Sequence, residues 1–460
     1  MDPATARRTE LLRDTLRRFV RRGARSSITK LLAKVRPEDV ATLLKSITPA
    51  ERMVVFRILT ADYPGEVGDV LTELEASQRN ELLERVGPDE VAEILERLPS
   101  DDAVFLVDSL PEDLQQRVLS SVDERGTSDV QAQLTFEDDT AGRIMNREFF
   151  SLPAATLVRE AIASIQENRD VELIFYLYVV DAEGGLAGVT SLRQLLLAPP
   201  EKSLGEIAQR DVIQVTTATD QEEVAQLAAR YDLLAIPVID EDGVLVGIVT
   251  VDDIVDIVKE EATEDFLKMV GTSEDEIIYQ DKSLKVAAIR FPWLALNLVG
   301  GLLTGLLLQR FQISLAEALF LLAFVPVIMG MGGNIGSQTA TITVRGLATG
   351  RIGSGERWLP RFLWQQLKVG VVLGITFALI VAVAATVLRQ NPWYAAVVGG
   401  SMLCAMVLAS VNGAAIPLVF RRLGIDPALA AGPLVTTTND ITGILIYFSF
   451  ASLLIELLLR

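Results

Sequence analysis

The sequence predicts a multidomain membrane protein: a cytoplasmic α-helical superhelix domain, an α/β domain, a connecting helix and a five-helix transmembrane domain. Three observations indicate this class. Charge is segregated, because residues 1–285 hold 31 basic and 56 acidic residues, whereas residues 286–460 hold 11 and 5. The second part is so apolar that the whole chain has a mean hydropathy of +0.34 despite 22% charged residues. Two different internal repeats lie in the acidic part.

Residues 1–25 form a basic N-terminal segment with eight arginines and three acids. No apolar core segment follows, so this is not a signal peptide. We expect a basic amphipathic helix on the protein surface. Contact with anionic lipid or with the acidic domain is the alternative.

Residues 26–132 are predicted to form an acidic domain of short stacked helices. Residues 36–41 read RPEDVA and residues 87–92 read GPDEVA. Proline in the first turn followed by acids is typical of a helix start, so the repeat predicts stacked helix pairs. The apolar positions are assigned to the core and to no function.

Residues 133–258 contain a different repeat, with a period of 59 residues. Residues 179–189 (VVDAEGGLAGV) align with residues 238–248 (VIDEDGVLVGI). Apolar runs on either side of an Asp/Gly turn predict two strands in each unit, followed by a helix.

Residues 259–281 are expected to form a helix that connects this domain to the membrane. They belong to the most acidic stretch, since residues 211–281 hold 19 acids against Arg230, Lys259 and Lys268. A solvated acidic face is one interpretation. The other is that divalent cations supply the missing countercharge, because crowded carboxylates repel one another.

Residues 282–460 are predicted to cross a membrane five times. A spanning helix needs about 20 largely apolar residues. Four runs carry no charge, and a fifth is apolar apart from Asp440. The expected helices are residues 286–310, 315–344, 361–389, 392–420 and 427–458.

The loop charges predict the orientation of these helices. Ten Lys and Arg lie on the side of the acidic domains, against three on the other side: Arg310, Arg389 and Arg460. Because positive loops stay inside, we expect a multi-pass protein of the cell (inner) membrane with a cytoplasmic N-terminus and an external C-terminus.

Two polar stretches interrupt the apolar segments, at residues 326–341 and 426–443. The first is rich in glycine, hydroxyl and amide groups, and a tight packing seam is its alternative interpretation. The second contains Asp440, and an acid at mid-membrane costs about 2.5–3.5 kcal/mol on insertion scales. A buried neutral acid is the alternative for Asp440. An ion pathway is the interpretation we favour for both stretches.

Composition excludes several chemistries. The chain has no histidine and a single cysteine, Cys404, which excludes imidazole catalysis, intrachain disulfides and thiolate zinc sites. Metal ligands must be mostly oxygens, which suit Mg²⁺, Ca²⁺ or Mn²⁺. No nucleophile–base pair is recognisable, so we expect no enzyme, and we expect no nucleic-acid partner.

Several motifs resemble the MgtE family of magnesium channels. They are residues 332–338 (GGNIGSQ), 426–429 (DPAL), 439–447 (NDITGILIY), 219–225 (TDQEEVA) and 261–265 (EATED). The α/β repeat also looks like a tandem pair of cystathionine-β-synthase (CBS) modules. The resemblance implies a homodimer in lipid with one Mg²⁺ pore on its two-fold axis, closed by cytosolic Mg²⁺ through a plug helix, residues 259–281.

The resemblance also implies site residues. Asp440 and Asn334 would bind Mg²⁺ in the pore. The regulatory Mg²⁺ sites would be formed by Asp69, Asp101, Gly142, Asp220, Glu222, Ala229, Asp232, Asp253, Asp256, Glu261, Glu264, Asp265 and Asp426, with Gly142 and Ala229 contributing only backbone carbonyls.

A CBS module often holds an adenine nucleotide on a Thr-x-x-Asp motif. Here Thr250 and Asp253 match that motif, so ATP or another adenine nucleotide is implied, whereas Ser191 and Gln194 in the first unit lack the acid. The competing function is therefore a membrane-anchored nucleotide or energy sensor whose spans only dimerise. Thr250 and Asp253 favour it, while Asp440 and the polar stretch at 326–341 disfavour it.

Overall fold

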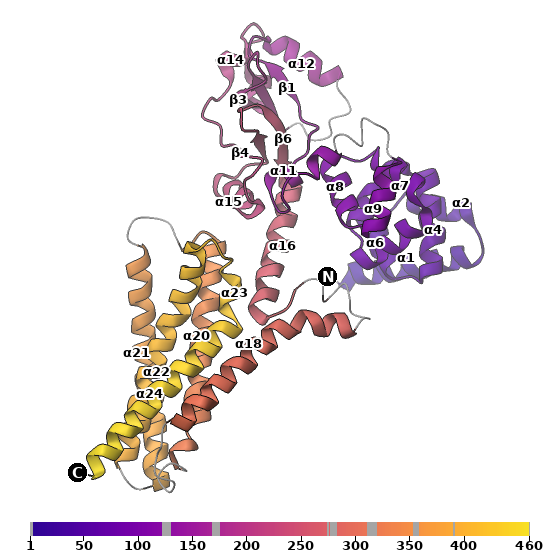
Figure 1. Cartoon of the computed structure of the whole chain (residues 1–460). Coiled ribbons are helices and arrows are strands. Elements are labelled where there is room, and N and C mark those ends of the chain that lie inside the picture. Colours follow the sequence, from indigo (N-terminus) through magenta and orange to yellow (C-terminus); the bar gives the residue numbers. More distant parts are fainter. Residues whose placement is uncertain are drawn as a thin grey trace. The chain divides into compact units, whose positions relative to one another are not determined.

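The computed structural model describes residues 3–121, 130–167, 175–273, 276, 283–310, 320–352, 358–389 and 392–459. The chain divides into two compact units, Met1–Val258 and Lys259–Arg460. The first unit contains a domain of short helices and an α/β domain with two sheets, and the second contains long apolar helices (Figure 1).

The helical domain is a stack of short helices around one continuous apolar core. Its elements are α1 (Pro3–Arg21), α2 (Arg25–Leu32), α3 (Pro37–Lys45), α4 (Pro49–Asp62), η1 (Pro64–Glu66), α5 (Val67–Thr72), α6 (Ala76–Val86), α7 (Pro88–Leu95), α8 (Ser100–Asp108) and α9 (Glu112–Leu119). Pro37 and Pro88 occupy the first turns of α3 and α7, where a missing N–H costs no helical hydrogen bond. Helices α3 and α7 therefore begin where the repeated proline–acid motif predicts.

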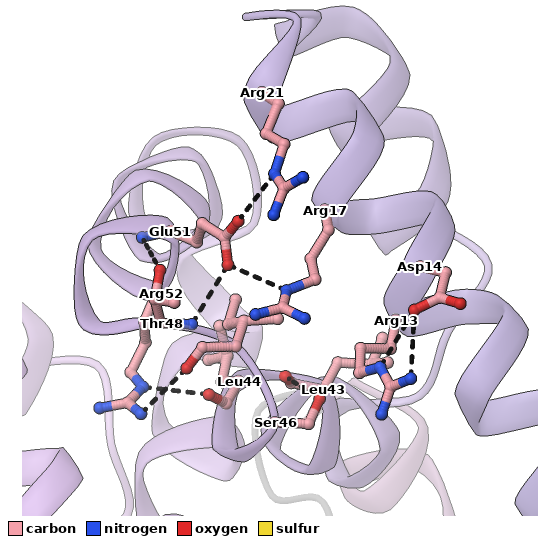
Figure 2. Close-up of polar contacts among 11 residues, drawn as sticks. Arg13, Asp14, Arg17, Arg21, Leu43, Leu44, Ser46, Thr48, Glu51 and Arg52 are labelled. Carbon is pink, nitrogen blue, oxygen red and sulfur yellow. Dashed lines mark hydrogen bonds and ion pairs between the residues drawn. The ribbon is translucent and has the colours of Figure 1, made fainter.

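The basic N-terminal segment packs on this domain as helix α1. Leu16 is fully buried in the domain core. On the polar side, Arg17 and Arg21 reach the Glu51 carboxylate, with N–O distances of 3.1 and 3.6 Å (Figure 2). Glu51 and Thr48 form the capping box that begins α4. The expected basic helix on the protein surface is therefore present as α1, and it contacts the acidic domain.

The α/β domain repeats one small sheet twice. Its elements are α11 (Ala141–Ile144), β1 (Ser151–Pro153), α12 (Val158–Glu167), β2 (Tyr176–Val180), β3 (Leu186–Ser191), α13 (Leu192–Leu197), α14 (Leu204–Ile207), β4 (Val215–Thr216), α15 (Gln221–Tyr231), β5 (Ala235–Ile239) and β6 (Leu245–Thr250). The sheets have the orders β1-β2-β3 and β4-β5-β6, each with one parallel and one antiparallel pair. Tyr176 pairs with Ser191 in the first sheet, and Ala235 pairs with Thr250 in the second. Each residue of the second pair lies 59 positions after its counterpart, as the repeat predicts.

The helix that leaves the α/β domain differs from the one expected. Helix α16 (Val251–Val270) begins directly after β6 and ends before Gly271, rather than spanning residues 259–281. Gly271 has φ of +79°, a left-handed conformation that glycine adopts readily and that ends a helix. Residues 274–275 and 277–282 lie outside the described residues.

The second unit contains α18 (Ser283–Arg310), α20 (Val325–Ala348), α21 (Trp358–Arg389), α22 (Pro392–Arg422), α23 (Ala428–Ala431) and α24 (Pro433–Leu459). Four helices in the described residues are long and apolar enough to cross a membrane: Ser283–Arg310, Phe320–Ala348, Trp358–Leu388 and Pro392–Arg422. They match the first four predicted spans. The fifth corresponds to α24, a helix of 27 residues, and α20, α22 and α24 pack side by side (Figure 1).

The fifth predicted segment, residues 427–458, is not one continuous helix. It breaks at Gly432, where α23 ends and Pro433 begins α24. Proline disfavours the helical conformation in the residue before it, and Gly432 has ψ of −115°. A side chain at this position would also begin 2.3 Å from the carbonyl oxygen of Met269 on α16. The break therefore lets the end of α16 approach the start of α24.

Candidate functional site

The N-terminal half of α24 is connected to three neighbouring helices by its polar side chains. The Thr436 hydroxyl lies 3.3 Å from the Ser337 hydroxyl on α20. Thr437 donates to Asn297 Oδ1 on α18, at 3.2 Å. Asn439 Oδ1 accepts from Asn412 Nδ2 on α22, also at 3.2 Å. The polar residues 436–439 therefore lie where α24 meets α18, α20 and α22.

Asp440 is the next residue on α24, and its carboxylate takes part in none of these bonds. It is half-buried, and within the described part of the chain no side-chain hydrogen bond or ion pair engages it. Its Oδ1 lies 3.9 Å from where a side chain of Gly333 on α20 would begin. Asn334, which follows Gly333, is exposed in the single chain. The two residues predicted for the pore thus come from facing turns of adjacent helices.

Five aspartates gather where the helical domain meets the α/β domain. They come from α5, α8 and the first turn of α16, and we call them the interdomain carboxylates: Asp69, Asp101, Asp102, Asp252 and Asp253. The same two domains are also joined by Arg143 on α11, which binds Asp108 on α8 with N–O distances of 2.6 and 2.9 Å. This ion pair contributes to holding the two domains together.

The electrostatics of the interdomain carboxylates oppose full ionisation. Burial, followed by the charges of Asp253 and Asp102, raises the pKa of Asp101 well above its usual range. Burial, followed by the charges of Asp69 and Asp252, raises the pKa of Asp102 to about 6. Burial also raises the pKa of Asp253 to about 7, although the Thr250 hydroxyl donates to it. Charge crowded in this way binds a proton or a cation.

A second set of the residues predicted for the regulatory sites lies at the two ends of α15. Asp220 caps the start of the helix by accepting from the Glu222 amide at 2.8 Å. Gly142 lies beside it, since its amide donates to Thr217 O at 2.9 Å and a side chain there would meet that oxygen. Ala229 and Asp232 lie at the other end, where Asp232 has φ of +52°. Within one chain, α15 therefore keeps Asp220 and Asp232 apart.

A third group surrounds Lys268 near the end of α16, and we call it the Lys268 cluster: Glu264, Asp265, Lys268 and Asp426. The Lys268 ammonium lies 2.6 Å from Glu264 Oε1 and 2.7 Å from Asp426 Oδ2. Burial alone would lower the pKa of Lys268, but its bonds to Asp426 and Glu264 outweigh burial and raise it. Burial, followed by the charge of Asp426, raises the pKa of Asp265 to about 6. Asp256 and Glu261 lie on α16 between this cluster and Asp253.

Three polar residues at these sites were not predicted from the sequence. Asp102 and Asp252 directly adjoin predicted acids in the first turns of α8 and α16, so pairs of acids at helix starts were the available signal. For Lys268 the sequence offers only its place as one of three bases in an acidic stretch. No three His, Cys, Asp or Glu side chains in the described residues converge closely enough to hold a metal ion. The hard oxygen donors nevertheless suit a hydrated divalent cation, which retains its water ligands.

The nucleotide motif is formed in the second α/β unit. The Thr250 hydroxyl donates to Asp253 Oδ2 at 2.7 Å and also contacts Asp252. In the first unit, Ser191 and Gln194 instead form a capping box at the start of α13. This difference agrees with the expectation that only the second unit carries the acid of the motif.

Three family models match the chain. The model for a divalent cation transporter matches residues 325–450, the model for the MgtE intracellular N domain matches residues 35–139, and the CBS-domain model matches residues 141–201 and 204–260. All the carboxylate groups described above fall within or beside these matches.

Curated relatives and solved structures agree with the models. A magnesium transporter MgtE of Thermus thermophilus is 41% identical over 74% of this chain and 76% of its own length. One of Bacillus subtilis is 35% identical over 74% of each chain. A crystal structure of the cytosolic domain of the Mg²⁺ channel MgtE in complex with ATP is 35% identical, with a TM-score of 0.51 over 53% of this chain and 99% of that one.

Proposed function

Because the chain belongs to the MgtE family of magnesium transporters, a family of multi-pass membrane proteins that are not enzymes, we propose that it is a Mg²⁺-selective channel for magnesium uptake, closed by cytosolic Mg²⁺. The observation that carries the proposal is Asp440, an acid in a membrane helix that is not engaged by a hydrogen-bond or ionic partner in the described residues. Such an acid normally faces a water-filled pathway or a bound ion.

We infer that the pore is formed by two copies of the chain. One chain supplies one carboxylate at this level, whereas hydrated Mg²⁺ is commonly held by one or two carboxylates through its waters. A two-fold axis beside Asp440 would pair two such groups and would bring in Asn334 from each copy. The ten-to-three bias of loop charge supports an orientation with the acidic domains in the cytoplasm.

Gating would use the interdomain carboxylates and the acids along α16. At low Mg²⁺ their mutual repulsion opposes close packing, and the pore is open. At high Mg²⁺ the ion neutralises and bridges them, and α16, acting as the plug helix, holds the pore closed. The raised pKa values of Asp102 and Asp253 support this mechanism, since burial first and then the charges of neighbouring aspartates make their ionised forms costly without a bound cation. Asp220, Glu222, Ala229 and Asp232 would then bind Mg²⁺ with groups from other parts of the dimer.

An adenine nucleotide such as ATP is the proposed second regulator. The crystallised MgtE cytosolic domain holds ATP, and in this chain Thr250 and Asp253 keep the Thr-x-x-Asp motif. Because Asp253 would serve both the nucleotide and the Mg²⁺ site, the two ligands would be coupled. The alternative, a nucleotide sensor without transport, retains this site but leaves Asp440 without a role.

The function is tested by Mg²⁺ flux into liposomes containing the purified full-length chain. Mg²⁺ is set independently on the two sides, and uptake is followed with an internal fluorescent indicator. We expect uptake that is fast when Mg²⁺ on the side of the soluble domains is low and that falls when it reaches millimolar levels. A protein that binds ATP but passes no Mg²⁺ would instead support the nucleotide sensor.

Lys268 provides a second test, because its ammonium occupies the position where a divalent cation would neutralise Glu264 and Asp426. In Lys268→Met the carboxylates lose this competitor and should bind Mg²⁺ more tightly. We expect inhibition at about two- to fivefold lower cytosolic Mg²⁺, the effect of a partly exposed ion pair worth up to about 1 kcal/mol.

The matched control for this test is Lys202→Met, which removes the same charge from an exposed position of the α/β domain. It should leave the inhibition curve in place. An unchanged or raised inhibitory concentration in Lys268→Met would contradict a role for this lysine as a competing cation.

A further inference from the structure

Three membrane helices meet at a notch formed by two glycines. A side chain on Gly413 of α22 would begin 2.3 Å from the carbonyl oxygen of Gly336 on α20. A side chain on Gly336 would begin 1.9 Å from Nδ2 of Asn439 on α24. The Asn439 amide thus occupies the space that any larger residue at 336 would need. The three helices can approach this closely only because both positions are glycine.

The Asn439 amide is buried here with a single bond. It is 1% exposed, and its Oδ1 accepts from Asn412 Nδ2 at 3.2 Å. Within the described residues its Nδ2 has no hydrogen-bond partner. A buried amide with an unsatisfied donor is unfavourable, and replacing both members of a polar pair by apolar residues of the same shape is often neutral for stability. Stability alone therefore does not explain why α22 and α24 carry this pair.

The amide pair links one face of α24 to α22, next to the residue that carries the proposed pore acid. Asn439 and Asp440 are adjacent, so they point about 100° apart around the helix. With Asn439 held between Asn412 and Gly336, the Asp440 carboxylate lies beside Gly333, one turn before Gly336 on α20. If Asn439 left the notch, α24 could rotate and carry Asp440 away from that turn. A buried polar group that specifies helix register is a recognised use of such residues.

We propose that Asn412 and Asn439 are positioning residues for the pore: their hydrogen bond, seated against Gly336 and Gly413, fixes the rotation of α24 and thereby the direction of the Asp440 carboxylate. This inference rests on the proposed role of Asp440 in the pore. It assigns ion selectivity, rather than folding, to two residues that do not themselves contact the ion.

The test compares Mg²⁺ and Na⁺ fluxes of Asn412→Leu, Asn439→Leu and the double variant in liposomes. Leucine has nearly the shape of asparagine but cannot make the bond. We expect each single variant to lose about tenfold or more of Mg²⁺ flux, as misplacing a binding group by about 1 Å can do. The ratio of Mg²⁺ to Na⁺ flux should also fall. The double variant should resemble either single one, because both remove the same bond.

Two further variants sharpen the test. Gly336→Ala should reproduce the defect, since its methyl group would displace the Asn439 amide. Ser449→Ala is the control, because the exposed Ser449 hydroxyl on α24 donates to Leu445 O within the same helix. It should leave the flux ratio unchanged.

The outcomes separate this inference from the proposed function. A purely structural role would lower the midpoint of thermal unfolding and the number of active channels, reducing both fluxes equally at a constant ratio, and that result would overturn the proposal. The proposal would also be overturned if both single variants kept wild-type flux and selectivity while Asp440→Asn was inactive. Wild-type flux in Asp440→Asn would instead refute the pore role of Asp440 itself.

Discussion

Asp440→Asn should abolish Mg²⁺ permeation while leaving the protein folded. The change keeps the size of the side chain and one oxygen but removes the charge. The proposed dimer would lose two carboxylates at once, and a hydrogen bond to a charged group contributes about 1.5–3 kcal/mol. We therefore expect Mg²⁺ flux to fall about 100-fold or more. Flux is measured in liposomes, with the oligomeric state and the unfolding midpoint measured on the same preparation.

The stability measurement distinguishes a pore acid from a structural one. Asp440 has no side-chain bond in the described residues, so its neutral amide should not weaken the fold, and removing a charge from a membrane helix should slightly favour insertion. Glu456→Gln, which neutralises the other acid of α24, is the control and should retain flux. Mg²⁺ flux near wild type in Asp440→Asn would move the ion site elsewhere, first to Asn334 and the threonines at 436–438.

Asp253→Asn should give a channel that stays active at high cytosolic Mg²⁺. The amide can still accept from Thr250, so the local hydrogen bond is kept. What is lost is a negative charge that interacts with Asp101 and that the proposed mechanism assigns to the regulatory Mg²⁺ site. We expect the inhibitory Mg²⁺ concentration to rise by about tenfold, because in the proposed mechanism such carboxylates bind Mg²⁺ more tightly in the closed state than in the open state.

We also expect Asp253→Asn to be more stable than the wild type above neutral pH. The pKa of Asp253 is raised to about 7 in the folded chain, against about 3.9 for an unperturbed aspartate. The folded state therefore holds this proton more tightly, and stability falls as pH rises from about 4 through 7. In Mg²⁺-free buffer at pH 8, Asp253→Asn should unfold at a higher temperature than the wild type, and Mg²⁺ should narrow the difference.

The control for both readouts is Asp211→Asn, an exposed acid of the same acidic stretch. It should change neither the inhibition curve nor the unfolding temperature. Normal Mg²⁺ inhibition in Asp253→Asn would show that the interdomain carboxylates do not sense the ion.

The sequence alone predicted the architecture and indicated which acids to consider for the pore and for Mg²⁺ sensing. Uncharged runs of spanning length, proline–acid helix starts and a period of 59 residues are local properties of the chain, and each reappears in the structure as a helix or a paired strand. Asp440 was identifiable for the same reason, because a charge within an apolar run is visible without knowing its neighbours. Which family the chain belongs to could likewise be inferred from short motifs.

Only the tertiary structure decided which of these groups meet. Asp101 and Asp253 are 152 positions apart, and Lys268 and Asp426 are 158 apart, so no local pattern can pair them. The bounds of the helix that carries the first part of residues 259–281 also depend on the fold, because α16 continues from the second α/β unit and ends before Gly271 through backbone conformation. The notch at Gly336 and Gly413 is of the same kind. In the sequence, a glycine indicates only that a side chain is missing. The fold shows that the Asn439 amide, next to Asp440 on α24, fills the space where a side chain of Gly336 would lie.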